Sequence, residues 1–415
     1  MRTGVSAALA LVLYGSAARA QDRTTEAGEA AIKDPTAECV GYTYAPVASA
    51  LANFPPLTPG VFVSSLLPGD SAGKAKFQAM SAGIPNIAPK NGSAGYPPAD
   101  PDCWWTVSQC VVPKLAGLKP DVAFVPEPKT LGYGFDDGPA CGHNVFYDYL
   151  AANKQKATFF YIGKNVLNYP LEAQRAVADG HEICVHTYSH PPMTTLSNEA
   201  AFGELWYGIQ AIKLVTGVTP TCWRPPQGDV DDRIRYIATQ LGLENVLWQF
   251  DSFDWESGTN GVTPADVQAN YDHLIGNATA GRFNNVGAIM LTHELNNFTM
   301  QTAIDNYKKI TGAFDHVVPI AVAQNRTQPY AETNFTMPNF AQYVAGTRTG
   351  GPPSASSTTS AGSGSSNGGA GSSGSSSSSG KATQASGKGA ACGLHVPGGL
   401  VATAALLASG LMLLA

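Results

Sequence analysis

Charge is scarce in this chain of 415 residues, of which only 13% are Asp, Glu, Lys or Arg, with a formal net charge of −6. The sequence has no run of Lys or Arg and no basic patch. Because nucleic-acid binding depends on clustered positive charge, we expect no nucleic-acid partner. The low charge favours a neutral partner, and the 44% hydrophobic content is enough to bury a full core.

The apolar segment at the C-terminal end, Leu400–Ala415, is shorter than the roughly 20 residues that a membrane-spanning helix needs. The small polar segment Ser386–Cys392 and a short spacer precede it, and no basic stop-transfer residue follows it. This order is typical of a GPI-attachment signal, whose tail is removed. We therefore expect residues 386–415 to be such a signal, with attachment between Ser386 and Ala391.

Residues 1–20 combine an early Arg, an apolar run and the cleavage pattern Ala18-Arg19-Ala20, which is typical of a secretory signal peptide. The alternative is a buried N-terminal helix. The Ser/Gly tract 350–380 cannot offset the entropy of folding, so residues 326–385 are expected to form a C-terminal segment and a flexible stalk.

Five N-x-S/T sequons fit a secreted, glycosylated surface: Asn91, Asn277, Asn297, Asn325 and Asn334. Together with both terminal signals, they predict a protein that is secreted through the ER. The GPI signal then predicts anchoring at the cell membrane and a place in the cell wall.

Cysteine is sparse, with seven in the chain, and Cys392 lies near the predicted processing site. The others are an even set, Cys39, Cys103, Cys110, Cys141, Cys184 and Cys222. An even number suits disulfides in an oxidising compartment, but the sequence leaves their connectivity open. Cys103 and Cys110 do not have a zinc-finger spacing, so a bridge is favoured over metal binding there.

Two regions differ in composition. Residues 21–125 are rich in Pro, Ala and Gly, which predicts an irregular N-terminal extension that packs on a core. From about Lys129 onward, apolar strand-like segments alternate with helical ones, which predicts an α/β fold with parallel strands. The expected strands are 129–137, 157–163, 181–186, 244–251 and 286–293, and the expected helices are 144–154, 171–180, 204–217, 231–242, 265–278 and 302–312.

Five polar segments stand where parallel strands would end, the position of active sites in such folds: 135–139, 186–190, 222–228, 250–255 and 291–293. His186 and His190 are four residues apart, so in a helical turn their rings would lie on one face. With Asp137 they could form a His₂-Asp metal site, although such a His pair also occurs by chance. His143 and His181 lack this placement and are expected to be ordinary polar residues.

Asp136 and Asp137 can take different roles, one as metal ligand and the other as general base. Gly138-Pro139 would end the strand and free both side chains from strict alternation. A turn cap is the alternative, but a cap needs only one Asp. Arg224 could offset the negative charge of the pair.

The remaining segments offer an acid and a binding surface. Asp254 could pair with His293 and keep it protonated as a general acid. The backbone N–H of Gln227 could be directed at an oxyanion. Trp255 could stack on a sugar, whereas Trp248 is expected in the core.

The order of these five segments resembles the five motifs of carbohydrate esterase family 4, the NodB-homology polysaccharide deacetylases. The resemblance covers roughly residues 125–320, and we place that domain at 126–325. It implies a distorted (β/α) barrel with fewer than eight regular repeats and a divalent cation, Zn²⁺ or Co²⁺.

The resemblance also implies residue roles. Asp137, His186 and His190 would bind the metal, and Asp136 would be the base held by Arg224. His293 would be the acid, oriented by Asp254 in preference to Asp251, and Leu291 would line the acetyl-methyl pocket. Many relatives have Tyr or Phe where this chain has Gln227, so ring contacts to the substrate would be lost.

With the terminal signals, the resemblance is to family members that deacetylate chitin in fungal cell walls. The expected reaction is hydrolysis of the N-acetyl groups of N-acetylglucosamine residues, giving chitosan and acetate, by a monomer. Another acetylated polysaccharide, such as acetylxylan or a partly deacetylated glucosamine polymer, is an alternative substrate. A non-catalytic wall-binding glycoprotein is the alternative of a different class.

Overall fold

The structure is a computed structural model that describes residues 22–347. The predicted signal peptide, the Ser/Gly tract and the predicted GPI signal lie outside the described residues. Within residues 22–347, no helix is long and apolar enough to cross a membrane.

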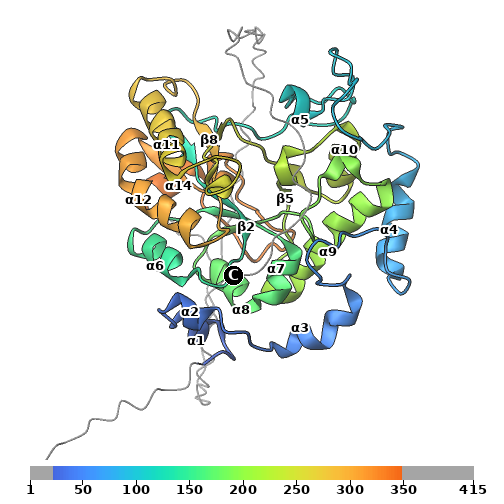
Figure 1. Ribbon diagram of the computed structural model, residues 1–415, viewed down its shortest axis with the longest axis horizontal. Coiled ribbons are helices and arrows are strands. Elements are labelled where there is room, and N and C mark those ends of the chain that lie inside the picture. Colours follow the sequence, from blue (N-terminus) through green and yellow to red (C-terminus); the bar gives the residue numbers. More distant parts are fainter. Residues whose placement is uncertain (1–21, 348–415) are drawn as a thin grey trace, which may run out of the picture. The chain divides into compact units, whose positions relative to one another are not determined.

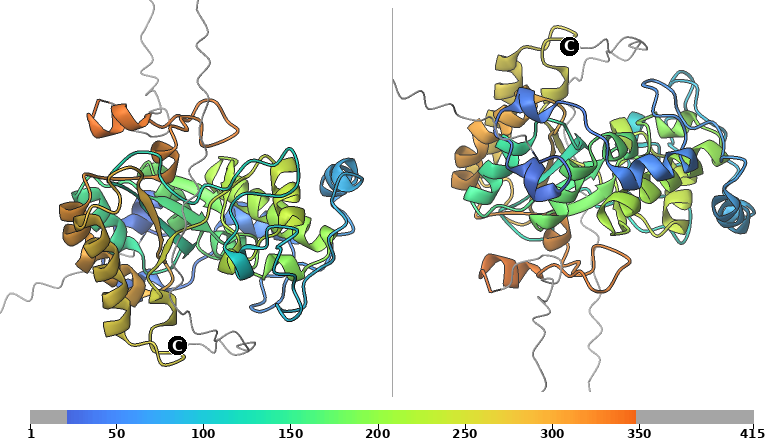
Figure 2. Two further views of the ribbon diagram at one scale, coloured as in Figure 1. Left: turned by 90° about the horizontal axis from the view of Figure 1, so that it is seen from above. Right: turned by 90° about the horizontal axis from the view of Figure 1, so that it is seen from below.

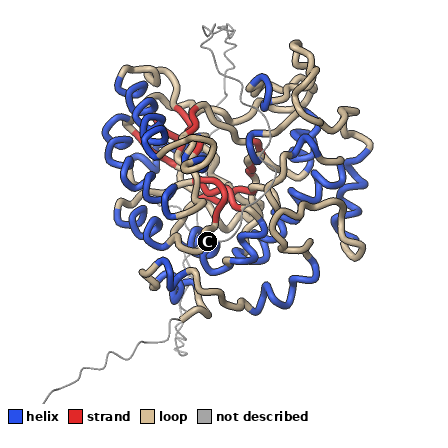
Figure 3. Tube along the Cα trace, in the orientation of Figure 1, coloured by secondary structure: helices blue, strands red, loops and turns tan. Residues whose placement is uncertain are grey.

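Parallel strands form the centre of the fold, and helices surround them (Figures 1 and 3). The strands are β1 (Thr130–Gly132), β2 (Gly134–Gly138), β3 (Thr158–Tyr161), β4 (Glu182–Val185), β5 (Cys222–Trp223), β6 (Glu244–Asn245), β7 (Phe250–Asp251), β8 (Ala288–Leu291) and β9 (His316–Val318). They pair in two sheets, in the orders β7-β8-β1-β9 and β2-β3-β4-β5-β6. Every residue of β3 and β4 is buried, as expected for parallel strands covered on both faces.

The two sheets close on each other into one distorted barrel. Two short connections join the sheets. Only Tyr133 separates β1 from β2, and only residues 246–249 separate β6 from β7, so at both places the chain passes directly from one sheet to the other. A parallel bridge between Asp136 and His293 also joins β2 to the segment after β8. The α/β fold with a distorted barrel is therefore confirmed.

The helices are α1 (Glu26–Ala30), α2 (Pro35–Glu38), α3 (Ala45–Ala50), α4 (Ser71–Ser81), α5 (Trp105–Ser108), α6 (Asn144–Ala152), α7 (Gly163–Asn168), α8 (Pro170–Ala178), α9 (Asn198–Thr216), α10 (Asp232–Gln240), α11 (Pro264–Thr279), α12 (Asn297–Ala313), α13 (Ile320–Ala323) and α14 (Phe340–Val344). Local sequence fixes their ends. Ser197 caps the N-terminus of α9 and Gly217 ends it in the left-handed conformation, while Thr263 and Asp266 form a capping box on α11.

The N-terminal extension is more regular than its composition predicted, because it contains α1 to α5. α1 packs on α8, α2 on α6, and α3 and α4 on α9. Figure 2 shows the first helices (blue) across the barrel in the view from below. Val63, Leu66 and Met80 belong to the same hydrophobic core as the barrel. Helices this short are fixed by caps and packing, such as the Thr25 side chain that accepts from Gly28 N, so periodicity did not reveal them.

Three disulfides join the six cysteines of the described chain: Cys39–Cys141, Cys103–Cys110 and Cys184–Cys222. The bridging of Cys103 with Cys110 is confirmed. Cys39–Cys141 ties the extension to the loop between β2 and α6, so the two regions are covalently linked.

Gly208 lies inside α9, where a helix normally disfavours glycine. A Cβ at this position would lie 2.9 Å from Thr187 O and 2.9 Å from Val185 Cγ1. Because Thr187 lies between His186 and His190, Gly208 allows α9 to approach the loop that carries both histidines.

Gly208→Ala should lower the free energy of unfolding by about 1–3 kcal/mol, because backbone atoms stand where the added methyl would go. Gly276→Ala is the matched control inside α11, since nothing lies within 4 Å of a Cβ there. The control should raise the free energy of unfolding by about 0.5–1 kcal/mol. Urea unfolding measures both changes, and equal shifts of the same sign would contradict the close packing of α9 on this loop.

Candidate active site

The polar segments predicted at strand ends gather at the carboxyl ends of the parallel strands. Asp136 and Asp137 lie near the end of β2, His186 follows β4, Arg224 follows β5 and His293 lies just beyond β8. Since these strands pair in parallel, their carboxyl ends meet at one rim of the barrel.

Arg224 and Asp136 form a buried ion pair at this rim, with Arg224 Nη1 donating to Asp136 Oδ1 at 2.7 Å. The Arg224 Cζ lies 4.0 Å from the centroid of the Phe160 ring, so an aromatic face also holds the guanidinium. Burial lowers the pKa of Arg224, and the Asp136 carboxylate acts in the opposite direction. The other oxygen, Asp136 Oδ2, lies 3.8 Å from His186 Nε2.

Asp137, His186 and His190 converge beside this pair. Asp137 Oδ1 lies 3.4 Å from His186 Nε2 and 3.3 Å from His190 Nε2. This oxygen is buried and makes no hydrogen bond to any of the described residues. A tetrahedral ion with bonds of about 2.0–2.1 Å needs ligand atoms about 3.3 Å apart. The donor set and its spacing therefore fit a divalent cation of the zinc type.

The protonation of these ligands suits a cation as well. His186 Nδ1 lies 2.7 Å from Arg224 O, and a carbonyl only accepts, so Nδ1 carries a hydrogen and Nε2 is the ring nitrogen that faces Asp137. Burial lowers the pKa of His190 to about 4, so the His190 ring is neutral at pH 7. Burial would raise the pKa of Asp137, but the two imidazoles outweigh it and hold that pKa below its usual range.

Residues 186–190 form a loop, so the helical turn expected from the His spacing is wrong. Thr187 and His190 have φ of 61° and 64°, and His190 N donates to Thr187 Oγ1 at 2.9 Å. Glu204 of α9 accepts the two backbone N–H groups at the centre of this turn, at 3.1 and 2.8 Å. The turn still brings the His186 and His190 ring centroids within 4.9 Å.

A β-bulge separates Asp136 from Asp137. The pairing of β2 with β3 shifts register between Asp136 and Gly138, and Asp137 has φ of 71°. β2 ends at Gly138, as Gly138-Pro139 predicted, but both aspartates still lie inside the strand, so the strand end does not free them from alternation. The bulge is instead the feature that lets both carboxylates approach His186.

His293 and Asp254 form a second buried pair. His293 Nδ1 lies 2.6 Å from Asp254 Oδ1, and His293 N donates to Asp254 Oδ2 at 3.1 Å. Burial alone would lower the pKa of His293, but the Asp254 carboxylate outweighs it and raises the pKa to about 10. Of the two aspartates that the sequence left open, Asp254 contacts His293, while Asp251 accepts from Phe253 N at 2.8 Å.

The other predicted site residues lie around the same strand ends. Trp255 is 44% exposed, whereas Leu291 is buried at the end of β8. Gln227 is exposed in the loop after β5 and has a left-handed φ of 58°. Trp248, expected in the core, is half-buried and packs on Trp105, with ring centroids 4.7 Å apart.

Trp104 and Trp105 of the N-terminal extension support the loop after β5, and no motif in the sequence pointed to them. Trp104 Nε1 donates to Asp229 Oδ1 at 2.7 Å. A Cβ on Gly228 would lie 2.2 Å from Trp105 Cζ3, so the indole packs directly on this backbone. The signal available in the sequence was the Cys103–Cys110 pair, whose bridge closes a short loop next to both tryptophans.

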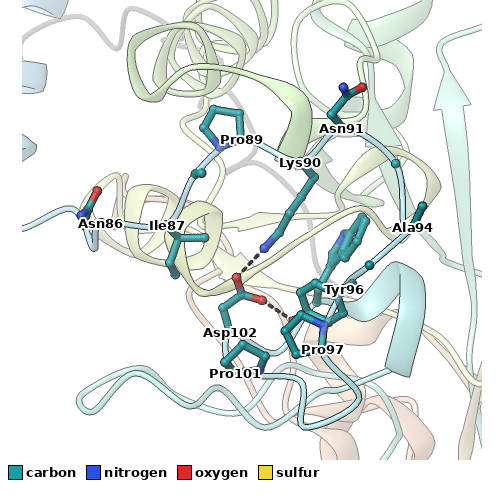
Figure 4. Close-up of a pocket in the computed structure, with 14 residues that line it drawn as sticks. Asn86, Ile87, Pro89, Lys90, Asn91, Ala94, Tyr96, Pro97, Pro101 and Asp102 are labelled. Atoms are coloured by element: carbon teal, nitrogen blue, oxygen red, sulfur yellow. Dashed lines mark hydrogen bonds and ion pairs between the residues drawn. The ribbon is translucent and has the colours of Figure 1, made fainter.

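A cavity of about 610 Å³ lies within the N-terminal extension and is lined by none of the predicted catalytic or metal-binding residues (Figure 4). Lys90 and Tyr96 both bond to the Asp102 carboxylate across it. These polar groups are therefore already paired with one another. The converging carboxylates and imidazoles at the barrel rim remain the better candidate site.

Four of the five sequon asparagines are exposed, namely Asn91, Asn297, Asn325 and Asn334. Asn277 is half-buried on α11, where its Nδ2 donates to His273 O at 2.8 Å. Glycosylation at these positions stays a prediction.

Comparison with known proteins shows the family of this chain. A sequence model described as polysaccharide deacetylase matches residues 125–246. Chitin deacetylase 2 of Cryptococcus neoformans var. grubii is 47% identical over 334 residues, which cover 78% of this chain and 73% of that protein. The chain belongs to the polysaccharide deacetylase family. A chitin deacetylase of Amylomyces rouxii is 44% identical over 312 residues, which cover 72% of this chain and 73% of that protein.

The range matched by the family model contains part of the candidate site of this polysaccharide deacetylase. Residues 125–246 include the aspartate pair, both loop histidines and Arg224, whereas Asp254 and His293 lie beyond them. Among solved structures, the chitin deacetylase of Colletotrichum lindemuthianum is similar, with 22% identity, a TM-score of 0.45 and coverage of 50% of this chain and 92% of that one.

Removing the Asp254 charge should change how His293 titrates. In the metal-free wild-type protein the ring should stay protonated until the pH nears its pKa of about 10. In Asp254→Asn the two largest interactions that raise the pKa are lost while burial remains, so the pKa should fall well below 10. By linkage, the wild-type pair adds stability that is complete below about pH 6.5 and is lost as the pH rises through the folded-state pKa.

NMR titration of the His293 ring in both proteins measures this difference. Asp251→Asn is the matched control and should shift the His293 pKa far less, because the ring nitrogen bonds to Asp254, whereas Asp251 accepts from Phe253 N. A wild-type ring that titrates near pH 6.5 would contradict the assigned pairing.

Proposed function

We propose that this chain hydrolyses the N-acetyl groups of N-acetylglucosamine residues in chitin, giving chitosan and acetate. One observation carries the proposal: a possible cation site, a carboxylate paired with Arg224 and an imidazole paired with Asp254 lie together at one rim of the barrel. The names of the relatives that match most of the chain supply the substrate class.

Asp137, His186 and His190 would hold a divalent cation, Zn²⁺ or Co²⁺. When bound, such a cation supplies Lewis acidity toward the substrate carbonyl and makes water a stronger nucleophile at neutral pH. Asp136 then acts as the general base, because its carboxylate lies beside the cation site and accepts a proton from the attacking water. Arg224 donates a hydrogen bond to that carboxylate and fixes its position.

His293 is the general acid in this proposal. Asp254 holds its Nδ1 proton and favours the imidazolium, so Nε2–H can be given to the leaving amine nitrogen. Asp136 and His293 are register partners across neighbouring strands, so the base and the acid occupy fixed positions. The Asp136 N–H and C=O both bond to the backbone flanking His293, at 2.9 and 2.8 Å.

Three further residues would contact the substrate. The backbone N–H of Gln227 would donate to the oxyanion, a contact worth about 3–4 kcal/mol for one donor. Leu291 would line the pocket for the acetyl methyl group, and the exposed Trp255 indole offers a flat face to a sugar ring.

Asp136→Asn and His293→Ala should each lower the rate of acetate release from chitohexaose by about 10²-fold or more, because each removes a proton-transfer group. Bound metal should stay at the wild-type level in both variants, since neither residue belongs to the cation site. Asp137→Asn should instead lose the metal and the activity together.

Acetate release and metal content are measured on the same preparations. Chelation should abolish release, and added Zn²⁺ or Co²⁺ should restore it. Near-wild-type release from Asp136→Asn or His293→Ala would refute the assigned roles. Release from acetylxylan but not from chitohexaose would refute the substrate, and no release from any acetylated glycan would favour a non-catalytic glycoprotein.

The location of the protein is a separate part of the proposal. Its three disulfides fit folding in an oxidising compartment. We propose that residues 386–415 direct GPI attachment, which holds the enzyme at the cell membrane next to the wall polymer.

Phosphatidylinositol-specific phospholipase C should therefore release the protein from a membrane fraction into the supernatant. Mock digestion without the lipase is the control. A protein that stays with the membranes and keeps an intact Ala415 terminus would show that the GPI assignment is wrong.

A further inference from the structure

Four groups of side chains among residues 22–347 bring possible metal ligands within 4.8 Å of one another. One is the candidate active site. Two others include cysteines that are committed to the Cys103–Cys110 and Cys184–Cys222 disulfides, so they offer no thiolate. The fourth group, Glu29, Glu38 and His143, has all of its ligand groups free of such bonds.

This fourth group lies where the N-terminal extension meets the barrel. Glu29 comes from α1, Glu38 ends α2 and His143 immediately precedes α6. All three side chains are buried, with relative exposures of 0%, 1% and 0%. Buried carboxylates need a partner for each charge, because leaving water costs several kcal/mol per ion.

Asn144 donates a hydrogen bond to only one oxygen of each of the two carboxylates. Its backbone N–H donates to Glu38 Oε1 at 2.8 Å, and its Nδ2 donates to Glu29 Oε1 at 3.1 Å. The second oxygen of each, Glu29 Oε2 and Glu38 Oε2, is buried and has no hydrogen-bond partner among the described residues. Each of these two buried carboxylates thus keeps one oxygen to which no hydrogen-bond donor of residues 22–347 is bonded.

His143 is oriented as a metal-binding histidine would be. Its Nδ1 lies 2.9 Å from Glu294 Oε1, while its buried Nε2 has no partner within the described part of the chain. Glu294 also accepts from Tyr147 OH at 2.9 Å and from Ala140 N at 3.1 Å, so this carboxylate is fixed in place. A carboxylate that holds one ring nitrogen and leaves the other free is the usual support of a metal-bound histidine.

The charge of Arg175, the arginine that bonds to Asn144, is already paired with other carboxylates. Arg175 bonds to the Asn144 side chain, but its guanidinium pairs with Asp148 at 2.7 Å and with Asp179 at 3.3 Å. Burial raises the pKa of the Glu38 carboxyl to about 8, although the neighbouring His143 acts in the opposite direction. A divalent ion would balance both Glu29 and Glu38.

We propose that Glu29, Glu38 and His143 form a second divalent-cation site, separate from the candidate active site, that fastens α1 and α2 to the start of α6. One imidazole nitrogen and two carboxylate oxygens are a donor set that Zn²⁺ accepts. The ion would be structural, since the site is closed to solvent. The alternative to a bound ion is a proton on one of the two carboxylates. These alternatives predict different metal contents for the protein.

Metal stoichiometry of the full chain separates these occupants. The protein is saturated with Zn²⁺, desalted, and measured by inductively coupled plasma mass spectrometry. Wild type should hold two equivalents, His190→Ala one, Glu38→Gln one, and the double variant none. Glu182→Gln is the matched control, because Glu182 is equally buried but bonds to Thr158, Ala321 and Arg326, and it should keep two.

The outcomes also separate this inference from the proposed function. One equivalent in wild type that His190→Ala removes would overturn the second site and leave the active-site cation standing. One equivalent that Glu38→Gln removes, with His190→Ala unchanged, would support the second site and contradict the active-site cation. The metal contents of wild type and His190→Ala can be interpreted even if Glu38→Gln does not fold.

X-ray absorption on Zn²⁺-loaded His190→Ala gives a second readout that does not use activity. Its spectrum should show one histidine nitrogen and carboxylate oxygens at about 2.0–2.2 Å. Chelation should lower the melting temperature of His190→Ala, because bound metal stabilises the folded state by mass action. A melting temperature and stoichiometry that do not respond to metal would mean that a proton occupies the site.

Discussion

The buried guanidinium of Arg224 connects the parts of the candidate active site. Its side chain donates to Asp136, while its backbone carbonyl accepts from His186 and fixes the tautomer of that ring. Its own N–H donates to Val185 O at 3.0 Å, which ties β5 to β4. One residue therefore sets the position of the proposed base through its side chain and of a proposed metal ligand through its backbone.

The adjacent aspartates are compatible because the backbone separates their surroundings. The bulge at Asp137 turns that carboxylate toward two imidazoles, while Asp136 stays in register and meets Arg224. On the other side of the site, the negative charge of Asp254 stabilises His293 as an imidazolium. Each buried charged side chain at the rim thus lies beside a group of opposite charge, or beside other ligand atoms with which it could bind a cation.

Much of this could be predicted from the sequence, because apolar strands followed by polar residues place those residues at one rim. The alternation of strands and helices predicted the α/β fold, and the five expected strand segments overlap with seven of the nine strands among residues 22–347. The family resemblance supplied the barrel. The two-residue β5 and the short β9 were missed, because so few residues show no period. The loop 186–190 was misjudged, because its conformation depends on Glu204, which is distant in sequence.

The contribution of the N-terminal extension could not be predicted from local patterns. Trp105 packs on Gly228 and Trp248 only after the chain has folded around the barrel, and composition alone suggested irregular coil. His143 was expected to be an ordinary polar residue, because its neighbours Glu29 and Glu38 are more than 100 residues away in the chain. Tertiary contacts of this kind leave no periodic signal in the sequence.

The central claim is that Arg224 serves Asp136 through its side chain and His186 through its backbone. The most direct test is to measure kcat for acetate release and the zinc content of Arg224→Met on the same preparation. The account predicts that kcat falls by about 10²-fold or more while zinc content is unchanged, because the substitution keeps the carbonyl that holds His186. An unchanged kcat, or loss of zinc from a folded variant, would contradict it.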